Sequence, residues 1–330
     1  MSETLRAYPS QAAGLLLPAA ESGCIGGQAV AGGVLMRRNR LCCAARRRNG
    51  AIVAERRPWT PLPRKYAAKG KFIRGLPAMA EGVLNGMREM DRADAIMKGK
   101  DAEASGGLAA AFMMTLVLAV ILLVIVPYAL ALLMRPAGIA PGSPFFHVWD
   151  GVLRVAVLCV YIGAAGRMPE LGNVFRCHGA EHKVVACYED GGSVSAERAA
   201  RFSRLHPRCG SSFILFTVLA TIFLHALIVP VFMAFVGGAD SLAARAAVLF
   251  LKTALIVPAA MAAYELLQLA ARRTKSMPAR ILAKLGLVLQ YLTTREPYMD
   301  ELELAVVALF EVVPESEKSR FSVPPYERNG

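Results

Sequence analysis

The stretch that decides the fold is GLAAAFMMTLVLAVILLVIVPYALALLM, residues 107–134, which contains no charged side chain. A helix needs about 20 apolar residues to cross the roughly 30 Å hydrocarbon core of a bilayer. This run is longer than that, and Pro127 lies near its far end, where a kink is tolerable. We therefore expect residues 107–134 to form the first of several membrane spans.

Three further apolar runs follow, at residues 145–166, 212–236 and 242–271. The first of these carries Asp150 and Arg154, which are four residues apart and can pair on one helix face while reaching the interface. The last carries Lys252, which we interpret as a snorkelling residue near the outer interface. The sequence thus predicts four spans.

The orientation of the spans follows from the basic residues of the loops, because cytoplasmic loops carry an excess of Lys and Arg. The segment before the first span and the loop at residues 167–210 are rich in both, whereas the loop after the first span has only Arg135 and the short loop 237–241 has none. Basic and non-basic loops alternate, so we expect both termini in the cytoplasm and the chain in the bacterial inner membrane.

Composition supports a membrane protein and limits its partners. The chain is 55% hydrophobic yet has a formal charge of +13, a combination that a soluble domain rarely shows. Nucleic acid is one common reason for a strongly basic protein, but these charges flank spans and lack interleaved aromatic residues. Membrane lipids with anionic headgroups are the expected partner, and nucleic acid is not. The oligomeric state has no signature in the sequence.

Outside the spans the sequence predicts a small N-terminal β-hairpin region and cytoplasmic amphipathic helices, in a fold that is otherwise mainly α. Residues 25–36 are typical of an extended, glycine-rich segment, and Asn49-Gly50 predicts a tight turn between strands at 41–48 and 51–57. Helical spacing at 72–97 indicates either an interfacial helix or one packed on the hairpin. Further helices are expected at 278–292 and 300–313. The expected divisions of the chain are a disordered terminus at 1–23, a cytoplasmic part at 24–100, the four-span part at 107–271, C-terminal helices at 272–313, and a disordered tail at 314–330.

Chemistry is expected in the loop at residues 167–210, which holds three of the five histidines. On a helix, His178 and His182 lie one turn apart on one face, which suits two imidazoles that bind one metal. Glu181 beside them is placed to act as a general base, and the spacing H-x-x-E-H is that of the inverted zinc-peptidase motif. His206 and Cys209, in a turn before the third span, offer further ligands.

Glu265, about two turns inside the cytoplasmic end of the fourth span, can complete such a site, because a carboxylate at that depth needs a partner, a proton or a cation. A closed structural zinc site, built from His178 or His182 with His206 and Cys209 and with Cys177 as an optional further ligand, competes with a catalytic one. His147 and His225 are interpreted as interfacial or helix-packing residues.

Five motifs in this order resemble the YqhQ-like family of bacterial membrane proteins, described as predicted metal-dependent enzymes: GGQAV at 26–30, FIRG at 72–75, HGAEHK at 178–183, LHPRCG at 205–210 and LTTREP at 292–297. The chain departs from the family pattern at 31–33, where Ala-Gly-Gly replaces Ile-Glu-Gly, and at Cys177, where a tyrosine is usual. The second departure makes Cys177 a doubtful ligand.

The resulting hypothesis is a metal-dependent enzyme of the hydrolase type, with a divalent metal, zinc by preference, at the cytoplasmic membrane interface and a lipid-linked or membrane-proximal substrate. The expected ligands are His178, His182, His206, Cys209 and Glu265, and Glu181 is the expected base. A non-catalytic membrane scaffold with a structural metal or histidine cluster, and a small transporter in which Glu265 and Lys252 line a path, are the alternatives.

Overall fold

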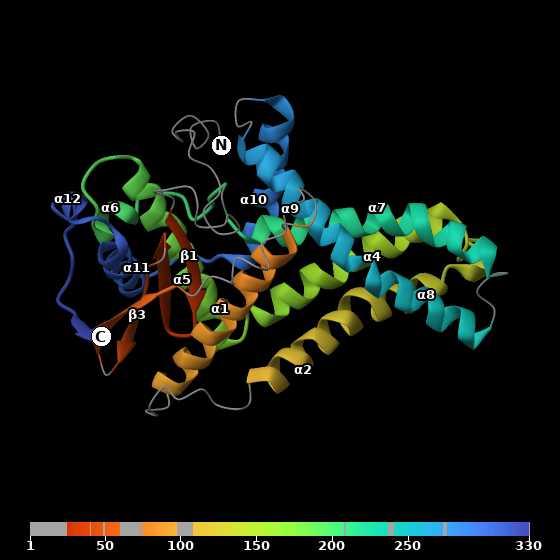
Figure 1. Ribbon diagram of the computed structural model, residues 1–330, viewed down its shortest axis with the longest axis horizontal. Coiled ribbons are helices and arrows are strands. Elements are labelled where there is room, and N and C mark those ends of the chain that lie inside the picture. The colour runs from red at the N-terminus through yellow and green to blue at the C-terminus, as the bar shows by residue number, and fades with distance from the viewer. Residues whose placement is uncertain are drawn as a thin grey trace.

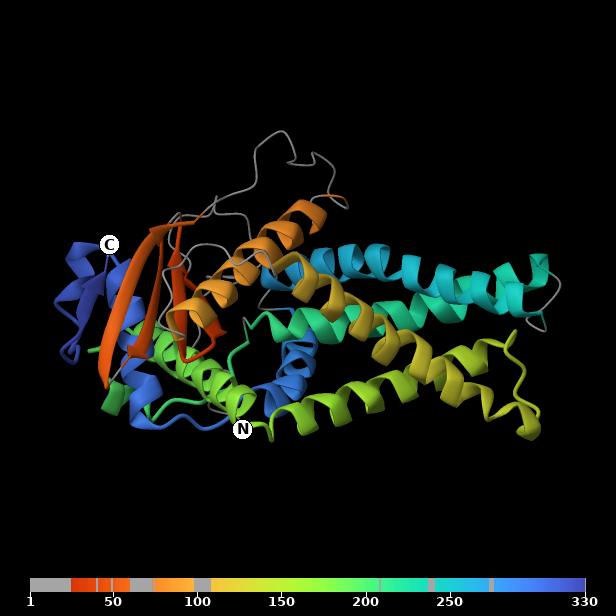
Figure 2. The same ribbon diagram turned by 90° about the horizontal axis from the view of Figure 1, so that it is seen from below.

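The chain folds into a bundle of long helices at one end and a small sheet covered by helices at the other (Figures 1 and 2). This computed structural model describes residues 25–39, 41–48, 50–59, 73, 75–97, 108–207, 209–236, 241–272 and 276–329. The predicted N-terminal region 1–23 lies outside the described residues.

The sheet has five strands in the order β1-β2-β3-β4-β5. Their bounds are β1 Ile25–Val30, β2 Gly33–Arg38, β3 Leu41–Arg48, β4 Ala51–Pro58 and β5 Glu327–Asn329. The first four strands form an antiparallel meander. Gly32 and Gly50 take positive φ angles of 67° and 85° in the turns before β2 and β4, a conformation that glycine adopts without steric cost. The hairpin predicted around Gly50 is confirmed.

Two predictions for this region are wrong. Residues 25–36 are not a single extended segment but the strands β1 and β2, joined through Gly32. The tail is not disordered over residues 314–329, because Glu315–Lys318 forms the helical turn α12 and β5 pairs in parallel with β4, with Glu327 opposite Val53. Buried Glu311 holds this tail by an ion pair with Arg328 (2.6 Å).

Helices cover both faces of the sheet. On one face, α5 (Pro169–Glu189) and α11 (Met299–Val312) share a hydrophobic core with the strands, and the short α6 (Ala196–Ala199) lies beside them. On the other face lies α1 (Gly75–Met97), where Glu81 accepts a hydrogen bond from Trp59 Nε1 (2.7 Å). The helix predicted at 72–97 therefore packs on the sheet, which is one of the two alternatives considered. Helix α5 occupies the first half of the predicted loop at residues 167–210, so this region is only partly a loop.

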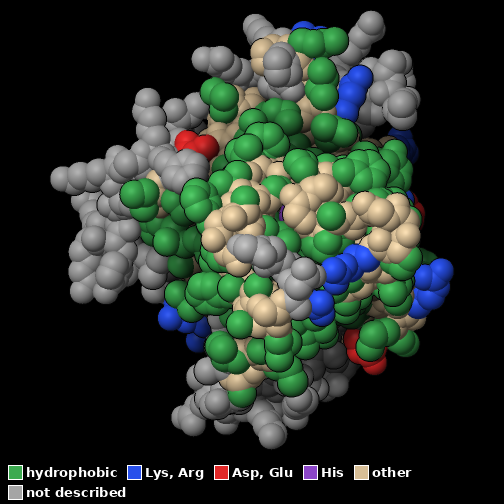
Figure 3. Space-filling view, turned by 90° about the vertical axis from the view of Figure 1, so that its right-hand side faces the viewer, with side chains coloured by type: hydrophobic (Ala, Val, Ile, Leu, Met, Phe, Trp, Pro, Cys, Tyr) green, Lys and Arg blue, Asp and Glu red, His purple; other side chains and the backbone are tan. Residues whose placement is uncertain are grey.

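Within the described part of the chain, the bundle contains four helices long and apolar enough to cross a membrane, as predicted: Met113–Leu132, Pro144–Ala165, Ser211–Phe235 and Leu242–Ala270. The first consists of α2 (Leu108–Val120), a π-helical turn (Ile121–Ile125) and α3 (Val126–Leu132). The 3₁₀ turn Arg135–Ala137 follows it. The second and third are α4 (Pro144–Ala165) and α7 (Ser211–Phe235), and the fourth joins α8 (Leu242–Ala254) to α9 (Ile256–Arg272). At the end of the bundle opposite the sheet, hydrophobic side chains predominate on the surface (Figure 3).

Three charged side chains, those of Asp150, Arg154 and Lys252, are buried within the bundle and do not reach an interface. Lys252 is fully buried, and its ammonium donates to Asp150 Oδ2 at 2.8 Å. Arg154 pairs with the same carboxylate oxygen at 3.4 Å, and its guanidinium also lies 3.2 Å from His225 Nδ1. The predicted pairing of Asp150 with Arg154 is confirmed and His225 packs between helices, but the interpretation of Lys252 as a snorkelling residue is wrong.

One further helix, α10 (Met277–Thr293), joins the bundle to the sheet region. It packs against α7 and α9 and runs crosswise to the long helices at the end of the bundle nearest the sheet (Figures 1 and 2). Both α10 and α11 were predicted, the first of them from its helical spacing. The C-terminal end of α10 contributes to the site described next.

Candidate metal centre

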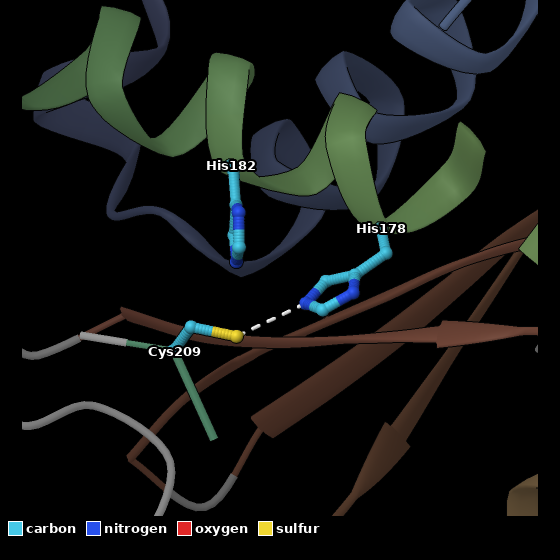
Figure 4. Close-up of side chains that lie close together, drawn as sticks. All are labelled: His178, His182 and Cys209. Atoms are coloured by element: carbon cyan, nitrogen blue, oxygen red, sulfur yellow. Dashed lines mark hydrogen bonds between the residues drawn. The ribbon is translucent and has the colours of Figure 1, made fainter. Parts of the chain in front are cut away.

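Helix α5 presents His178 and His182 toward the loop that precedes α7 (Figure 4). The two imidazoles are one turn apart, as predicted, and their ring centroids are 4.5 Å apart. Cys209, just before α7 begins, faces both rings. One ligand atom from each of these three residues lies within 4.8 Å of the other two. The structure thus brings together two imidazoles and a thiol from segments about thirty residues apart.

Each imidazole is held by a backbone carbonyl through its Nδ1 atom. His178 Nδ1 donates to the carbonyl of Thr293 (2.9 Å), and His182 Nδ1 donates to the carbonyl of Arg204 (2.6 Å). Because a carbonyl can only accept, both neutral rings carry their proton on Nδ1 and present a bare Nε2. This arrangement, in which the second ring nitrogen is anchored by an acceptor, is typical of histidines that bind metals.

The two bare nitrogens converge on the thiol. His178 Nε2 lies 3.1 Å from Cys209 Sγ, and His182 Nε2 is buried without a hydrogen-bond partner. An orphaned buried acceptor is costly, and a cation at this position would satisfy it. Imidazole nitrogen and thiolate sulfur are the ligands that zinc prefers, so the residues present fit a zinc-class ion.

The protonation states of these side chains also favour a cation. The pKa of the Cys209 thiol is lowered although burial alone would raise it, because a positive charge on the His182 ring and the hydroxyl and amide of Ser211 stabilise the thiolate. A metal ion bound to the neutral ring would supply that positive charge instead. The Ser211 amide donates to Cys209 Sγ at 3.3 Å. Burial lowers the pKa of His182, which keeps its imidazole neutral and able to bind a metal.

Glu181 lies beside the three residues without being part of the group that they form. Burial raises the pKa of its carboxyl group to about 8, while His178 lowers it and Cys209 raises it. A Cβ atom added to Gly27 of β1 would overlap the Glu181 carboxyl group. The sheet therefore closes over this carboxyl group, and only glycine at position 27 leaves room for it.

A second glycine brings the C-terminal end of α10 to the cluster. A Cβ atom on Gly179 would overlap the carbonyl oxygen of Arg295, whose amide donates to the Phe175 carbonyl at 2.9 Å. The neighbouring Thr294 accepts a hydrogen bond from the Arg204 guanidinium at its carbonyl (2.6 Å), and Glu296 pairs with Lys183. These contacts place the Thr293 carbonyl against His178. Thr293 lies in the motif at 292–297, but the sequence gives no sign of this role, because the contact with His178 is made by a backbone carbonyl and not by a side chain.

Two predicted ligands are not in the group. The His206 ring is adjacent to that of His182, with centroids 5.7 Å apart, but its Nε2 faces Glu189 Oε2 at 3.5 Å. Burial lowers the pKa of His206 to about 4. Among the described residues, Glu265 does not join the cluster of ligand atoms either. The doubtful Cys177 makes its contact with Asn173 (3.7 Å) rather than with the cluster.

Residues 71–315 match the model of a family described as "Protein of unknown function (DUF1385)". The chain is also similar to "Uncharacterized protein YqhQ" of Bacillus subtilis, with 31% identity over 275 residues that cover 76% of this chain and 81% of the relative. No solved structure matches the chain.

Proposed function

The chain belongs to the DUF1385 family of proteins of unknown function, and we propose a function for it from the chemistry of the His178, His182 and Cys209 side chains. The protein is a metal-dependent enzyme of the hydrolase type, embedded in the bacterial inner membrane. His178, His182 and Cys209 hold one divalent ion, with zinc the best fit. The supporting observation is that both imidazoles are anchored at Nδ1 and direct a bare Nε2 toward one thiol.

Three protein ligands distinguish a catalytic zinc site, which keeps one position open, from a structural site with four. When bound, such an ion acts as a Lewis acid and lowers the pKa of coordinated water. Glu181 is the proton acceptor, because its carboxyl group adjoins the ligands without joining them. Its pKa of about 8 lies near the working range of a general acid or base. His206 next to His182 shapes the site and is not a ligand.

The membrane orientation belongs to the same proposal. Basic loops and the sheet face the cytoplasm, with both termini inside, and the cluster lies where α7 begins. A site at that level suits a lipid-linked or membrane-proximal substrate. The buried pairing of Lys252 with Asp150 argues against the transporter alternative, in which Lys252 lines a path.

Metal analysis of the purified full-length protein tests the proposal. We expect about one divalent ion per chain in the wild type and the loss of most of it in Cys209→Ser and His182→Ala. Cys177→Ser is the matched control, since it removes a buried thiol next to His178 that does not face the cluster, and it should retain the ion. Glu181→Gln should retain the ion as well and lose activity only.

A spectroscopic measurement adds a readout that does not depend on activity. After cobalt substitution, a thiolate-to-cobalt charge-transfer band is expected in the wild type and in Cys177→Ser, and not in Cys209→Ser. Metal content that is unchanged by Cys209→Ser would refute the ligand set. A metal-free protein whose Cys209 is alkylated rapidly would instead indicate a cysteine–histidine nucleophile, which the 3.1 Å contact of His178 with Cys209 permits. Unfolding on removal of the ion would favour the structural scaffold.

A further inference from the structure

Helix α10 exposes an apolar stripe although it is not one of the four spans. Five of its side chains are exposed at intervals of three or four residues: Met277, Ile281, Leu285, Val288 and Leu292. At about 3.6 residues per turn these five fall within a sector of roughly 80°. Such a stripe normally faces a protein core or a membrane.

The opposite side of α10 is sealed against the bundle. Leu289 and Gln290 are buried, and a Cβ atom on Gly286 would overlap the Ser212 side chain at the start of α7. Packing within the chain is therefore complete on this side, and the exposed stripe faces away from α7. Among the described residues no segment covers the stripe, which leaves it open to a partner outside them.

The direction of α10 identifies the bilayer as that partner. The helix runs crosswise to the spans at the end of the bundle nearest the sheet (Figures 1 and 2), so with the spans across the bilayer it lies in the plane of one leaflet. Helix α9, which packs against α10, also exposes apolar side chains, Leu266 and Leu269. Exposed apolar groups on a span are expected to contact lipid.

The charges of α10 match a phospholipid headgroup. Lys284 and Arg280 are exposed on one flank of the stripe, and Tyr291 is exposed on the same flank. Basic and tyrosine side chains beside an apolar stripe are typical of helices that lie in the interface of an anionic membrane. Basic residues near such a surface are attracted to its negative charge. A protein partner, such as a second copy of this strongly basic chain, would gain less from these charges.

We propose that α10 lies in one leaflet of the bilayer, with its stripe among the acyl chains and with Lys284 and Arg280 at the phosphates of anionic phospholipids. The stripe ends at Leu292, directly before Thr293, whose carbonyl anchors His178. The cluster of His178, His182 and Cys209 therefore lies at the level of the headgroups. This placement is independent of whether the cluster binds a metal.

Tryptophan fluorescence in reconstituted full-length protein tests the proposal. The chain has two tryptophans, so a Trp59→Phe/Trp149→Phe background leaves a single probe in Val288→Trp, and Glu315→Trp on the exposed α12 turn is the control. In vesicles of phosphatidylcholine and phosphatidylglycerol with brominated acyl chains, we expect the Val288→Trp emission to shift to the blue and to lose most of its intensity. Aqueous iodide should quench only the Glu315→Trp variant.

Neutralising the flank tests the role of charge. In Val288→Trp, phosphatidylglycerol should increase the bromolipid quenching several-fold over phosphatidylcholine alone, and Arg280→Gln/Lys284→Gln should abolish that increase. Ile281→Trp on the same stripe provides a second probe if Val288→Trp does not fold. Quenching by iodide and not by bromolipids would overturn the proposal. Shielding from both quenchers would overturn it as well, because it would show that a second copy of the chain covers the stripe.

Discussion

The buried charges of the bundle predict an asymmetry between two single substitutions. Asp150 accepts from Lys252 Nζ at 2.8 Å and from Arg154 Nη2 at 3.4 Å, both on Oδ2. All three side chains are at most 2% exposed. This buried group of three side chains thus holds two basic groups for one carboxylate, and both basic groups depend on that carboxylate for their pairing. Asp150→Asn should be far more damaging than Lys252→Met.

The magnitudes follow from which charges stay paired. Asp150→Asn leaves two buried basic groups without their counter-ion, and breaking a buried pair in this way costs about 3–5 kcal/mol. Lys252→Met keeps the Asp150–Arg154 pair, removes one buried charge and roughly preserves side-chain volume. It loses the contact of the Lys252 ammonium with the Tyr128 ring, 4.7 Å from the centroid, so its cost should be below about 2 kcal/mol. The double variant Asp150→Asn/Lys252→Met should recover part of the loss of Asp150→Asn.

The free energy of unfolding is measured for the purified protein in mixed detergent micelles by titration with a denaturing detergent. The fluorescence of Trp149, which is adjacent to Asp150 in the sequence, reports the unfolding. Lys284→Met, which removes an exposed lysine of α10, is the matched control and should change stability by less than about 0.5 kcal/mol. Equal losses for Asp150→Asn and Lys252→Met would refute the reasoning, as would a double variant less stable than both.

Two further predictions concern the sheet. Gly27→Ala should destabilise the protein by about 1–3 kcal/mol, because the new methyl group displaces the Glu181 carboxyl group. Gly82→Ala in α1 is the control: an added Cβ meets nothing within 4 Å, so it should stabilise the helix by up to about 1 kcal/mol. Thermal unfolding compares the two variants. Arg328→Ala should lower the free energy of unfolding by about 1–3 kcal/mol, because it removes a partner of the buried Glu311 carboxylate (2.6 Å). The double variant Arg328→Ala/Glu311→Gln should be more stable than Arg328→Ala. The opposite order in denaturant titrations would contradict this account of the tail.

The parts of the fold that the sequence predicts are those with a local signature. An uninterrupted apolar run predicts a span because its length alone matches the bilayer, and Asn49-Gly50 predicts a hairpin because few dipeptides favour positive φ angles so strongly. The turn at Gly32 has no comparable partner residue, so β1 and β2 were expected as one segment. The strand β5 has no signature at all, since its pairing with Val53 joins residues more than 270 positions apart.

The same distinction explains the errors at the charged positions. A lysine ten residues into a span is consistent with snorkelling until Asp150 is known to face it from another helix. Glu265 was expected at the site from its depth in the fourth span, but depth along a helix does not fix the direction of a side chain. His178 and His182 were placed correctly because the spacing of four residues within one helix does fix their relative direction.

The arrangement of His178, His182 and Cys209 depends on small residues as much as on these three side chains themselves. Gly179 lets the Arg295 carbonyl approach α5, and this approach positions the adjacent Thr293 carbonyl on His178 Nδ1. Gly27 likewise lets β1 approach α5 and exclude water from Glu181, and that exclusion raises the pKa of the carboxyl group. Three motifs that are far apart in the chain therefore act on one helix: one fixes the tautomer of an imidazole, one raises the pKa of a carboxyl group, and one supplies the thiol. A glycine can thus determine the geometry of such a cluster as specifically as a histidine, because it decides which backbone atoms reach the imidazoles and the carboxyl group.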